Sequence, residues 1–280
     1  MRTISTDQIV NIVEKLCIDA NYYLNRDILT ALEDGLHKEE SDIGRSILEQ
    51  IIENAGIAKE EKMAICQDTG MAVVFLDVGQ EVYISGGSLT DAVNEGVRRG
   101  YKNGYLRKSV VKDPIERVNT GDNTPAIIHY NIVEGDKVKI TVAPKGFGSE
   151  NMSALKMLKP SDGIEGVKKF ILSTVDNAGP NPCPPMVVGV GIGGTMEKVA
   201  MLAKKALLRP IDESSNVEYV KNLEKEMLDS INKLGIGPSG LGGRITALAV
   251  NVEVFPTHIA GLPVAVNINC HATRHAEATI

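Results

Sequence analysis

The sequence predicts a mixed α/β fold, in which a helical N-terminal segment over residues 1–65 precedes mixed sheets flanked by helices. Apolar residues recur at helical spacing through the first part of the chain. Strand-like apolar runs begin near residue 71, and helix-like and strand-like segments then alternate to the end. Because no internal repeat, low-complexity tract or obvious linker interrupts the pattern, we expect one domain over residues 1–280.

Three helices are expected in the N-terminal segment. Thr6-Asp7 is a favourable helix start, and an apolar rhythm from Ile9 to Leu16 follows it. A second helix is expected over residues 26–37, and a third from Ser41-Asp42 to a stop near Gly56. Residues 71–78 then read as a buried strand directly after a turn.

The middle of the chain predicts a hairpin and further alternation. Thr90-Asp91 is expected to begin a helix that runs to about Arg99. Residues 126–133 and 137–142 are predicted to pair as strands across Glu134-Gly135-Asp136. The remaining expected elements are helices at 152–158, 164–177, 195–208 and 216–234, and strands at 186–190, 245–255 and 264–268.

Composition limits the classes of function. The chain has 43% hydrophobic and 24% charged residues, as an ordinary globular protein does. It has neither an apolar run of about 18 residues nor the apolar core of a signal peptide, so we expect a cytoplasmic protein with reduced thiols. A net charge of −6 and 4% aromatic residues argue against nucleic acid as a partner. An anionic substrate would therefore need a local cationic pocket.

Two glycine clusters invite chemical interpretations. Gly189-x-Gly191-x-x-Gly194 matches the dinucleotide fingerprint as a string, but no acidic residue ends a strand about 20 residues later. A nicotinamide-dependent dehydrogenase is therefore a distant alternative, and a tight turn with close packing is the simpler explanation. The cluster at residues 237–244 either presents backbone N–H groups to an anion or forms a mobile loop.

Three of the four cysteines lie in segments that resemble ligand loops. Cys17 sits in the apolar rhythm of the first helix and is expected in the core. Cys66, Cys183 and Cys270 instead lie beside turn-forming or ionisable residues. Three thiolates gathered at one point would hold an iron–sulfur cube by three corners and leave the fourth iron open to substrate. Spacing alone leaves open that the three are unrelated, or that they bind a structural metal.

Other candidates carry an ordinary structural explanation beside the functional one. Asp68 could act as an acid or base, or could cap its own turn. His258, after a predicted strand, could orient a substrate or form a structural hydrogen bond. The cations nearest to the candidate site loops are Arg107, Lys145, Arg244 and Arg274. Each of them can also be explained as ordinary surface charge.

Several unusual strings occur together and in order. They are CQDTG at 66–70, KGFGSEN at 145–151, NPCPP at 181–185 with GVGIGG at 189–194, GPSGLGG at 237–243 and NINCHATR at 267–274. With these strings the chain resembles the alpha subunit, or N-terminal half, of the iron–sulfur class of fumarate hydratases and L-tartrate dehydratases. The resemblance covers most of residues 60–277.

The resemblance implies roles for particular residues. Cys66, Cys183 and Cys270 match the three ligands of a 4Fe–4S cluster. Gln67 and Asp68 match positions that contact the substrate and act as acid or base. Arg107 matches an arginine that binds a substrate carboxylate, and Gly148 matches a backbone contact to the substrate. His258 matches an active-site histidine. Fused relatives continue beyond the position of Ile280, so the resemblance implies a separate beta subunit of about 200 residues in a hetero-oligomer.

The expected reaction is the reversible hydration of fumarate to L-malate, with the cluster as Lewis acid. The alternative is the L(+)-tartrate dehydratase alpha subunit, which would convert tartrate to oxaloacetate. The carbon-side base is expected from the partner subunit. An iron open to a dicarboxylate is also open to oxidants, so loss of activity in air is expected.

Overall fold

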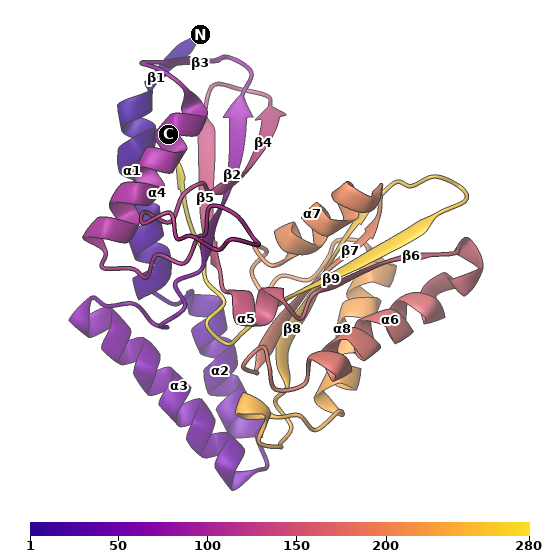
Figure 1. Ribbon diagram of the computed structural model, residues 1–280. Helices are drawn as coiled ribbons and strands as arrows, with labels where there is room; N and C mark the ends of the chain where they lie inside the picture. Colours follow the sequence, from indigo (N-terminus) through magenta and orange to yellow (C-terminus); the bar gives the residue numbers. More distant parts are fainter. The chain divides into compact units, whose positions relative to one another are not determined.

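A computed structural model describes residues 1–280, and the chain folds into two compact units. Unit 1 comprises Met1–Leu24, Asn54–Phe147 and Arg274–Ile280, and unit 2 comprises Asn25–Glu53 and Gly148–Thr273. Helices and mixed sheets occur in both, which confirms the predicted mixed α/β class (Figure 1). No helix is both long and apolar enough to cross a membrane.

In unit 1, helices α1 (Thr6–Tyr22) and α4 (Leu89–Asn103) pack together on one face of a sheet. A capping box between Ser5 and Gln8 begins α1, and the Ser88 side chain caps α4. The caps predicted at Thr6-Asp7 and Thr90-Asp91 therefore lie one and two residues later than the observed ones. Cys17 lies in this core and is 0% exposed, as expected. A Cβ atom at Gly100 of α4 would come within 2.7 Å of the Cys17 Cβ, so a glycine is needed there.

The unit 1 sheet has the order β10-β5-β2-β4, so the predicted hairpin pairing is wrong. Strand β2 lies between the two expected partners, parallel to β4 and antiparallel to β5. The strands are β2 (Met71–Gly79), β4 (Ile127–Val133), β5 (Val138–Lys145) and β10 (Ala276–Thr279). The turn passes over the end of β2 at Gly79, where a Cβ would lie 2.4 Å from the Gly135 carbonyl oxygen. Strand β2 is long and apolar, and a central position between β4 and β5 pairs both of its edges and buries it in the sheet.

Two further strands of unit 1, β1 (Arg2–Ser5) and β3 (Val82–Ser85), pair in parallel and were not foreseen.

Helix α3 (Asp42–Glu61) begins where expected but continues past Gly56, which faces open space. A glycine on an exposed helix face lowers helix stability by only about 1 kcal/mol, so it need not end the helix.

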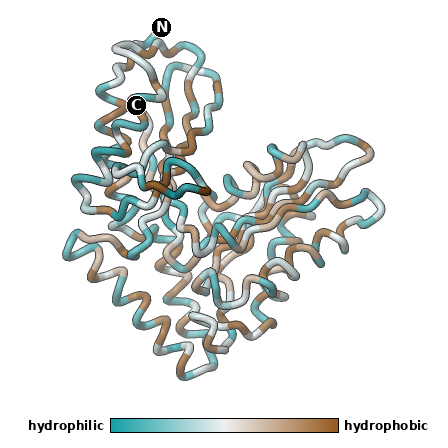
Figure 2. The backbone as a smooth tube through the Cα atoms, in the orientation of Figure 1, coloured by the Kyte–Doolittle hydropathy of each residue, from teal (hydrophilic) through white to brown (hydrophobic).

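Unit 2 contains a sheet of order β6-β9-β7-β8 between two layers of helices. Helix α7 covers one face, and α6 and α8 cover the other (Figure 1). The elements are α2 (Arg26–Lys38), α5 (Phe147–Glu150, which spans the boundary of the units), β6 (Ala154–Leu158), α6 (Gly163–Ala178), β7 (Met186–Gly193), α7 (Met196–Ala206), α8 (Glu218–Asn232), β8 (Ala247–Phe255) and β9 (Leu262–Asn269). Figure 2 shows the apolar residues running along the strands, where the helices cover them.

The predicted helix at residues 152–158 is wrong, because this segment forms strand β6 and pairs antiparallel with β9 over its whole length. The glycines of the GxGxxG string lie partly inside β7. A Cβ at Gly189 would approach the Ala203 carbonyl oxygen to 2.3 Å, and one at Gly191 would approach that of Val199 to 2.3 Å. These glycines therefore allow α7 to pack closely on the sheet, as the simpler explanation proposed.

Candidate functional site

The loop at residues 66–70 leads from α3 into β2 and carries three of the predicted site residues. Cys66 and Asp68 are half-buried, and Gln67 is exposed. The Asp68 carboxylate accepts a hydrogen bond from the backbone N–H of Gly70 at 3.0 Å and another from that of Phe147 at 2.9 Å. The carboxylate thus caps its own turn and is held in one orientation.

A glycine of the KGFGSEN string makes room for this carboxylate. A Cβ at Gly146 would lie 3.2 Å from Asp68 Oδ2, tighter than most contacts of real Cβ atoms. The same segment crosses the turn closely, since a Cβ at Gly70 would lie 2.7 Å from the Lys145 backbone nitrogen. Two of the unusual strings therefore meet in unit 1, at Asp68.

The loop that carries Arg107 is joined to the Asp68 turn by hydrogen bonds. The Thr69 hydroxyl donates to the Arg107 carbonyl oxygen at 2.8 Å. The hydroxyl of Tyr101, on α4, donates to the carbonyl oxygens of Thr69 at 2.7 Å and Gly70 at 3.1 Å. Burial raises the pKa of the Tyr101 phenol, so it stays a neutral donor. The Arg107 side chain itself is exposed.

Asn123 completes this connection and was not found from the sequence. It is 0% exposed, with a backbone φ of 63°. Its side-chain oxygen accepts from the backbone N–H groups of Ser109 at 2.7 Å and Val110 at 3.3 Å. Its amide nitrogen donates to the Gly70 carbonyl oxygen at 3.1 Å. The only sequence signal was a turn-rich GDNTP segment, which does not reveal these distant partners.

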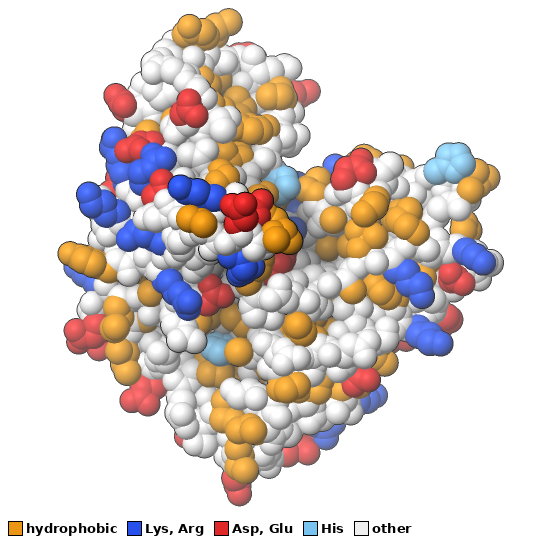
Figure 3. Space-filling view, in the orientation of Figure 1, with side chains coloured by type: hydrophobic (Ala, Val, Ile, Leu, Met, Phe, Trp, Pro, Cys, Tyr) orange, Lys and Arg blue, Asp and Glu red, His pale blue; other side chains and the backbone are white.

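Arg274 is a buried part of unit 1 rather than surface charge. It is 5% exposed, and its guanidinium donates to the Asp68 carbonyl oxygen at 2.5 Å. Its position at the end of the NINCHATR string was visible in the sequence, but its partner was not. Exposed Lys and Arg side chains also gather around α4 and the loop after it (Figure 3).

Unit 2 brings together the loops of Cys183 and Cys270. Cys183 is exposed and has a φ of 55°. Its carbonyl oxygen accepts from the backbone N–H of His271 at 3.3 Å and lies 3.1 Å from His271 Nδ1. The half-buried Cys270 has its carbonyl oxygen bonded by the Thr273 hydroxyl at 3.0 Å. Two of the three candidate ligand loops are therefore in direct backbone contact.

The other strings of unit 2 pack around these loops. The Ser239 N–H donates to the Pro184 carbonyl oxygen at 2.9 Å, and a Cβ at Gly240 would lie 2.1 Å from the Pro180 Cβ. A Cβ at Gly148 would meet only the Asn181 carbonyl oxygen, at 3.8 Å. The glycines of residues 237–243 thus let two loops approach closely, one of which carries Cys183.

A carboxylate of the chain itself accepts the N–H groups that follow this glycine cluster. Glu39 is 3% exposed, and its carboxylate accepts from the backbone N–H groups of Glu40, Ser41, Arg244 and Ile245 at 2.8–3.0 Å. Burial alone would raise the pKa of Glu39, but these hydrogen bonds hold it below its usual value. Two backbone N–H groups at the end of this glycine-rich loop therefore bind an anion of the chain itself, Glu39.

The KGFGSEN string also supports the end of β9. Glu150 forms an ion pair with Lys204 of α7 at 2.6 Å and accepts from the Asn267 side chain at 2.7 Å. Asn267 also donates to the Ser153 hydroxyl at 2.8 Å. Because β9 leads directly into Cys270, these contacts fix the start of the cysteine loop.

His258 lies elsewhere in unit 2. It sits in the exposed connection between β8 and β9, and its Nδ1 accepts from the Ala260 N–H at 3.1 Å. Cys270 follows the opposite end of β9 (Figure 1). The eight residues of β9 separate the two by about 26 Å of strand. Unit 2 therefore does not bring His258 to Cys183 and Cys270.

The exposure of the thiols fits the ligand role that the sequence suggested. Cys66, Cys183 and Cys270 are all half-buried or exposed in loops, whereas Cys17 is fully buried and burial raises its pKa. Soft thiolates in accessible loops suit an iron–sulfur group. Cys66 belongs to unit 1 and the other two to unit 2, and neither unit alone gathers three or more side chains able to hold a metal ion.

Comparison with known proteins matches almost the whole chain. The family model for fumarate hydratase (Fumerase) matches residues 10–279. A putative L(+)-tartrate dehydratase subunit alpha of Methanocaldococcus jannaschii is 48% identical over 275 residues, which are 96% of each chain. The L(+)-tartrate dehydratase subunits alpha of Escherichia coli K12 and Shigella sonnei are each 33% identical over 263 residues, 90% of this chain and 86% of theirs. The chain therefore belongs to the fumarate hydratase (Fumerase) family of hydro-lyases.

Proposed function

We propose that this chain is the alpha subunit of a two-subunit hydro-lyase that dehydrates L(+)-tartrate to oxaloacetate. The names of the similar alpha subunits favour tartrate over the fumarate expected from the sequence. Hydration of fumarate to L-malate is the second candidate, because the family model carries that description. The observation that carries the proposal is the hydrogen-bonded arrangement in unit 1, which fixes the Asp68 carboxylate and the Arg107 segment to one turn.

Cys66, Cys183 and Cys270 are proposed as the ligands of a 4Fe–4S cluster. When bound, such a cluster supplies a Lewis acid beside the hydroxyl group that leaves. Backbone contact between Cys183 and His271 supports a shared role for Cys183 and Cys270. The chain reaches Arg274 four residues after Cys270, and Arg274 is bonded to Asp68, two residues after Cys66. Connectivity thus supports the inclusion of Cys66.

Asp68 is proposed to exchange the proton at the substrate oxygen. Dehydration breaks a C–H bond beside a carboxylate and expels a hydroxyl group, which leaves as water once a proton reaches its oxygen. The two backbone N–H groups that donate to the Asp68 carboxylate hold it in a fixed direction for this transfer. The beta subunit is proposed to supply the base that takes the carbon-bound proton.

Three residues are proposed to bind the dicarboxylate. The exposed Arg107 can receive a substrate carboxylate in the bidentate geometry that a guanidinium favours. Gln67, exposed beside Asp68, can donate to a substrate oxygen, and Gly148 can offer its backbone. His258 lies too far along β9 to reach a substrate beside its own Cys270. We therefore propose that it serves the site of another copy of the chain.

Co-purification of this chain with its beta subunit, followed by anaerobic loading with iron and sulfide, tests the proposal. We expect a brown complex that converts L(+)-tartrate to oxaloacetate faster than it converts D-tartrate or L-malate. Faster turnover of L-malate and fumarate would favour the second candidate. A colourless complex, or one inactive with all of these substrates, would refute the proposed function.

A further inference from the structure

Three side chains of unit 1 hold the Asp68 turn: Thr69 and Asn123 join it to the Arg107 loop, and Tyr101 joins it to α4. We call Thr69, Tyr101 and Asn123 the loop clamp. Each uses a side-chain polar atom to bond backbone atoms of residues 69–70 or 107–110, and all three are buried. The backbone that follows Arg107 is held at two points, because Thr69 bonds the Arg107 carbonyl oxygen and Asn123 bonds the N–H groups of Ser109 and Val110.

Asn123 is suited to this task by its chemistry. Its amide accepts two backbone hydrogen bonds on the oxygen and donates one from the nitrogen, which neither a carboxylate nor an aliphatic side chain reproduces. It also adopts a left-handed backbone conformation, which asparagine tolerates better than most residues. A buried backbone group left without a partner is costly, so loss of this amide would release the loop rather than leave it in place.

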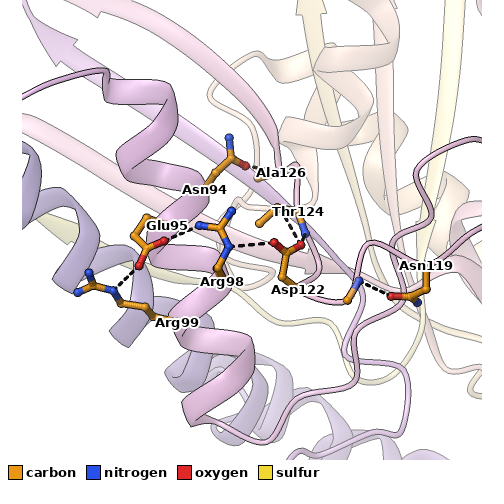
Figure 4. Close-up of polar contacts among 9 residues, drawn as sticks. Asn94, Glu95, Arg98, Arg99, Asn119, Asp122, Thr124 and Ala126 are labelled. Carbon is orange, nitrogen blue, oxygen red and sulfur yellow. Dashed lines mark hydrogen bonds and ion pairs between the residues drawn. The ribbon is translucent and has the colours of Figure 1, made fainter.

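The residues around Asn123 hold it rigidly. The Asp122 carboxylate accepts from Thr124 at 2.7 Å and 3.0 Å and from Arg98 Nε at 2.9 Å (Figure 4). Partial burial alone would raise the pKa of Asp122, but the hydrogen bonds from Thr124 and Arg98 lower it to about 2. The Ala126 N–H donates to Asn94 of α4 at 2.9 Å (Figure 4). The segment on either side of Asn123 is therefore fastened to one helix.

We propose that Asn123 and Thr69 are positioning residues that set the placement of Arg107 relative to Asp68, and so the affinity for the dicarboxylate. The inference rests on the proposed function, in which Arg107 binds a substrate carboxylate and Asp68 moves a proton. Because a carboxylate clamp acts alike in the ground state and the transition state, its displacement raises KM more than it lowers kcat. A purely structural role would instead lower stability or the amount of active enzyme.

Variants in the alpha–beta complex loaded with iron and sulfide separate these roles. Thr69→Val removes the hydroxyl at nearly constant volume, and Thr69→Ser restores it. Asn123→Asp keeps the acceptor and removes the donor to the Gly70 carbonyl. The matched control is Asn131→Ser on β4, whose amide donates only to the side chain of Asp77. Arg107→Gln tests the proposed function directly.

We expect Thr69→Val and Asn123→Asp to raise KM for L(+)-tartrate about tenfold, with kcat within about threefold of the parent. Thr69→Ser and Asn131→Ser should stay near the parent values. In Asn123→Ala, which removes the acceptor of the Ser109 and Val110 N–H groups, the peptide containing these two residues should also exchange its amide hydrogens faster, a readout independent of activity.

Two outcomes would overturn different claims. If Arg107→Gln leaves KM unchanged, the proposed role of Arg107 fails, and the positioning inference fails with it. If Arg107→Gln raises KM but Thr69→Val and Asn123→Asp do not, or lower kcat alone, the positioning inference fails and the proposed function stands. If Asn123→Asp does not fold, the pair Thr69→Val and Thr69→Ser decides alone.

Discussion

The buried carboxylate of Glu39 provides a sharp test of how the loops of unit 2 are held. Glu39→Gln keeps the size of the side chain but replaces one acceptor oxygen by an NH2 group. That group would face the backbone N–H groups of either Glu40 and Ser41 or Arg244 and Ile245, which now donate to the carboxylate. Two charge-assisted hydrogen bonds are lost and their donors stay partly buried, so we expect a loss of about 2 kcal/mol in the free energy of unfolding.

The loss should depend on pH in a defined direction. Because the folded state lowers the pKa of Glu39, its ionised carboxylate stabilises the fold fully above the unfolded pKa of about 4.3. This contribution is lost as pH falls through the lower folded pKa. The difference between the parent and Glu39→Gln should thus be largest near neutral pH and shrink below about pH 4.

Glu40→Gln is the matched control. Glu40 is the next residue, and its ion pair with Arg244 at 2.9 Å is mostly exposed, so we expect a loss below about 1 kcal/mol. Urea unfolding at several pH values gives the free energies, and amide exchange of residues 236–246 reports the loop itself. The reasoning is refuted if Glu39→Gln is no more destabilising than Glu40→Gln, or if its deficit persists undiminished at pH 3.

The remaining predictions concern the proposed active site. Cys183→Ser should prevent stable iron binding in the reconstituted complex, whereas Cys17→Ala should retain the iron; equal iron content in the two would remove Cys183 from the ligand set. Asp68→Asn should keep iron but lower kcat by about 100-fold or more, and near-normal turnover would exclude it as acid/base. A mixture of Asp68→Asn and His258→Asn complexes, each inactive alone, should regain activity after subunit exchange; no recovery would contradict a role for His258 in another copy's site. Activity should decay in air and return with iron and sulfide, and full activity after prolonged aeration would argue against an iron open to solvent.

The sequence predicted the elements whose signals are local. The helices α6 and α8 were found within two residues of their ends, because apolar periodicity is a property of the segment itself. The hairpin failed because the turn Glu134-Gly135-Asp136 does not reveal that β2 lies between its two strands. Residues 152–158 are rich in good helix formers, but pairing with β9 outweighed that propensity.

The candidate site divides in the same way. The cysteine loops stood out because each thiol lies within a few positions of turn-forming residues, and this combination can be seen in the local sequence. Arg274 was visible as a cation, but its partner, 206 residues away, was not. Asn123 and Glu39 did not stand out, since they have partners 53 and 205 residues away along the chain. A buried polar residue is recognisable from sequence only when its partner is near in sequence. These residues hold the loops without any local motif of their own.

At two of the places where the chain passes from one unit to the other, the adjoining residue of unit 1 donates a hydrogen bond to Asp68. Phe147, the last residue of one unit 1 segment, donates its N–H to the Asp68 carboxylate. Arg274, the first residue of the next, donates to the Asp68 carbonyl oxygen. Both residues are therefore anchored within unit 1 at the point where the chain passes to or from unit 2. Asp68→Ala should therefore loosen the Phe147 amide in hydrogen exchange, while Asp68→Asn, whose single acceptor oxygen can turn toward the Phe147 N–H, should protect it better than alanine does. Comparison of the two variants separates the anchoring function of Asp68 from its proposed proton transfer. The turnover rate should fall in both variants, whereas the protection of the Phe147 amide should be lost only in Asp68→Ala.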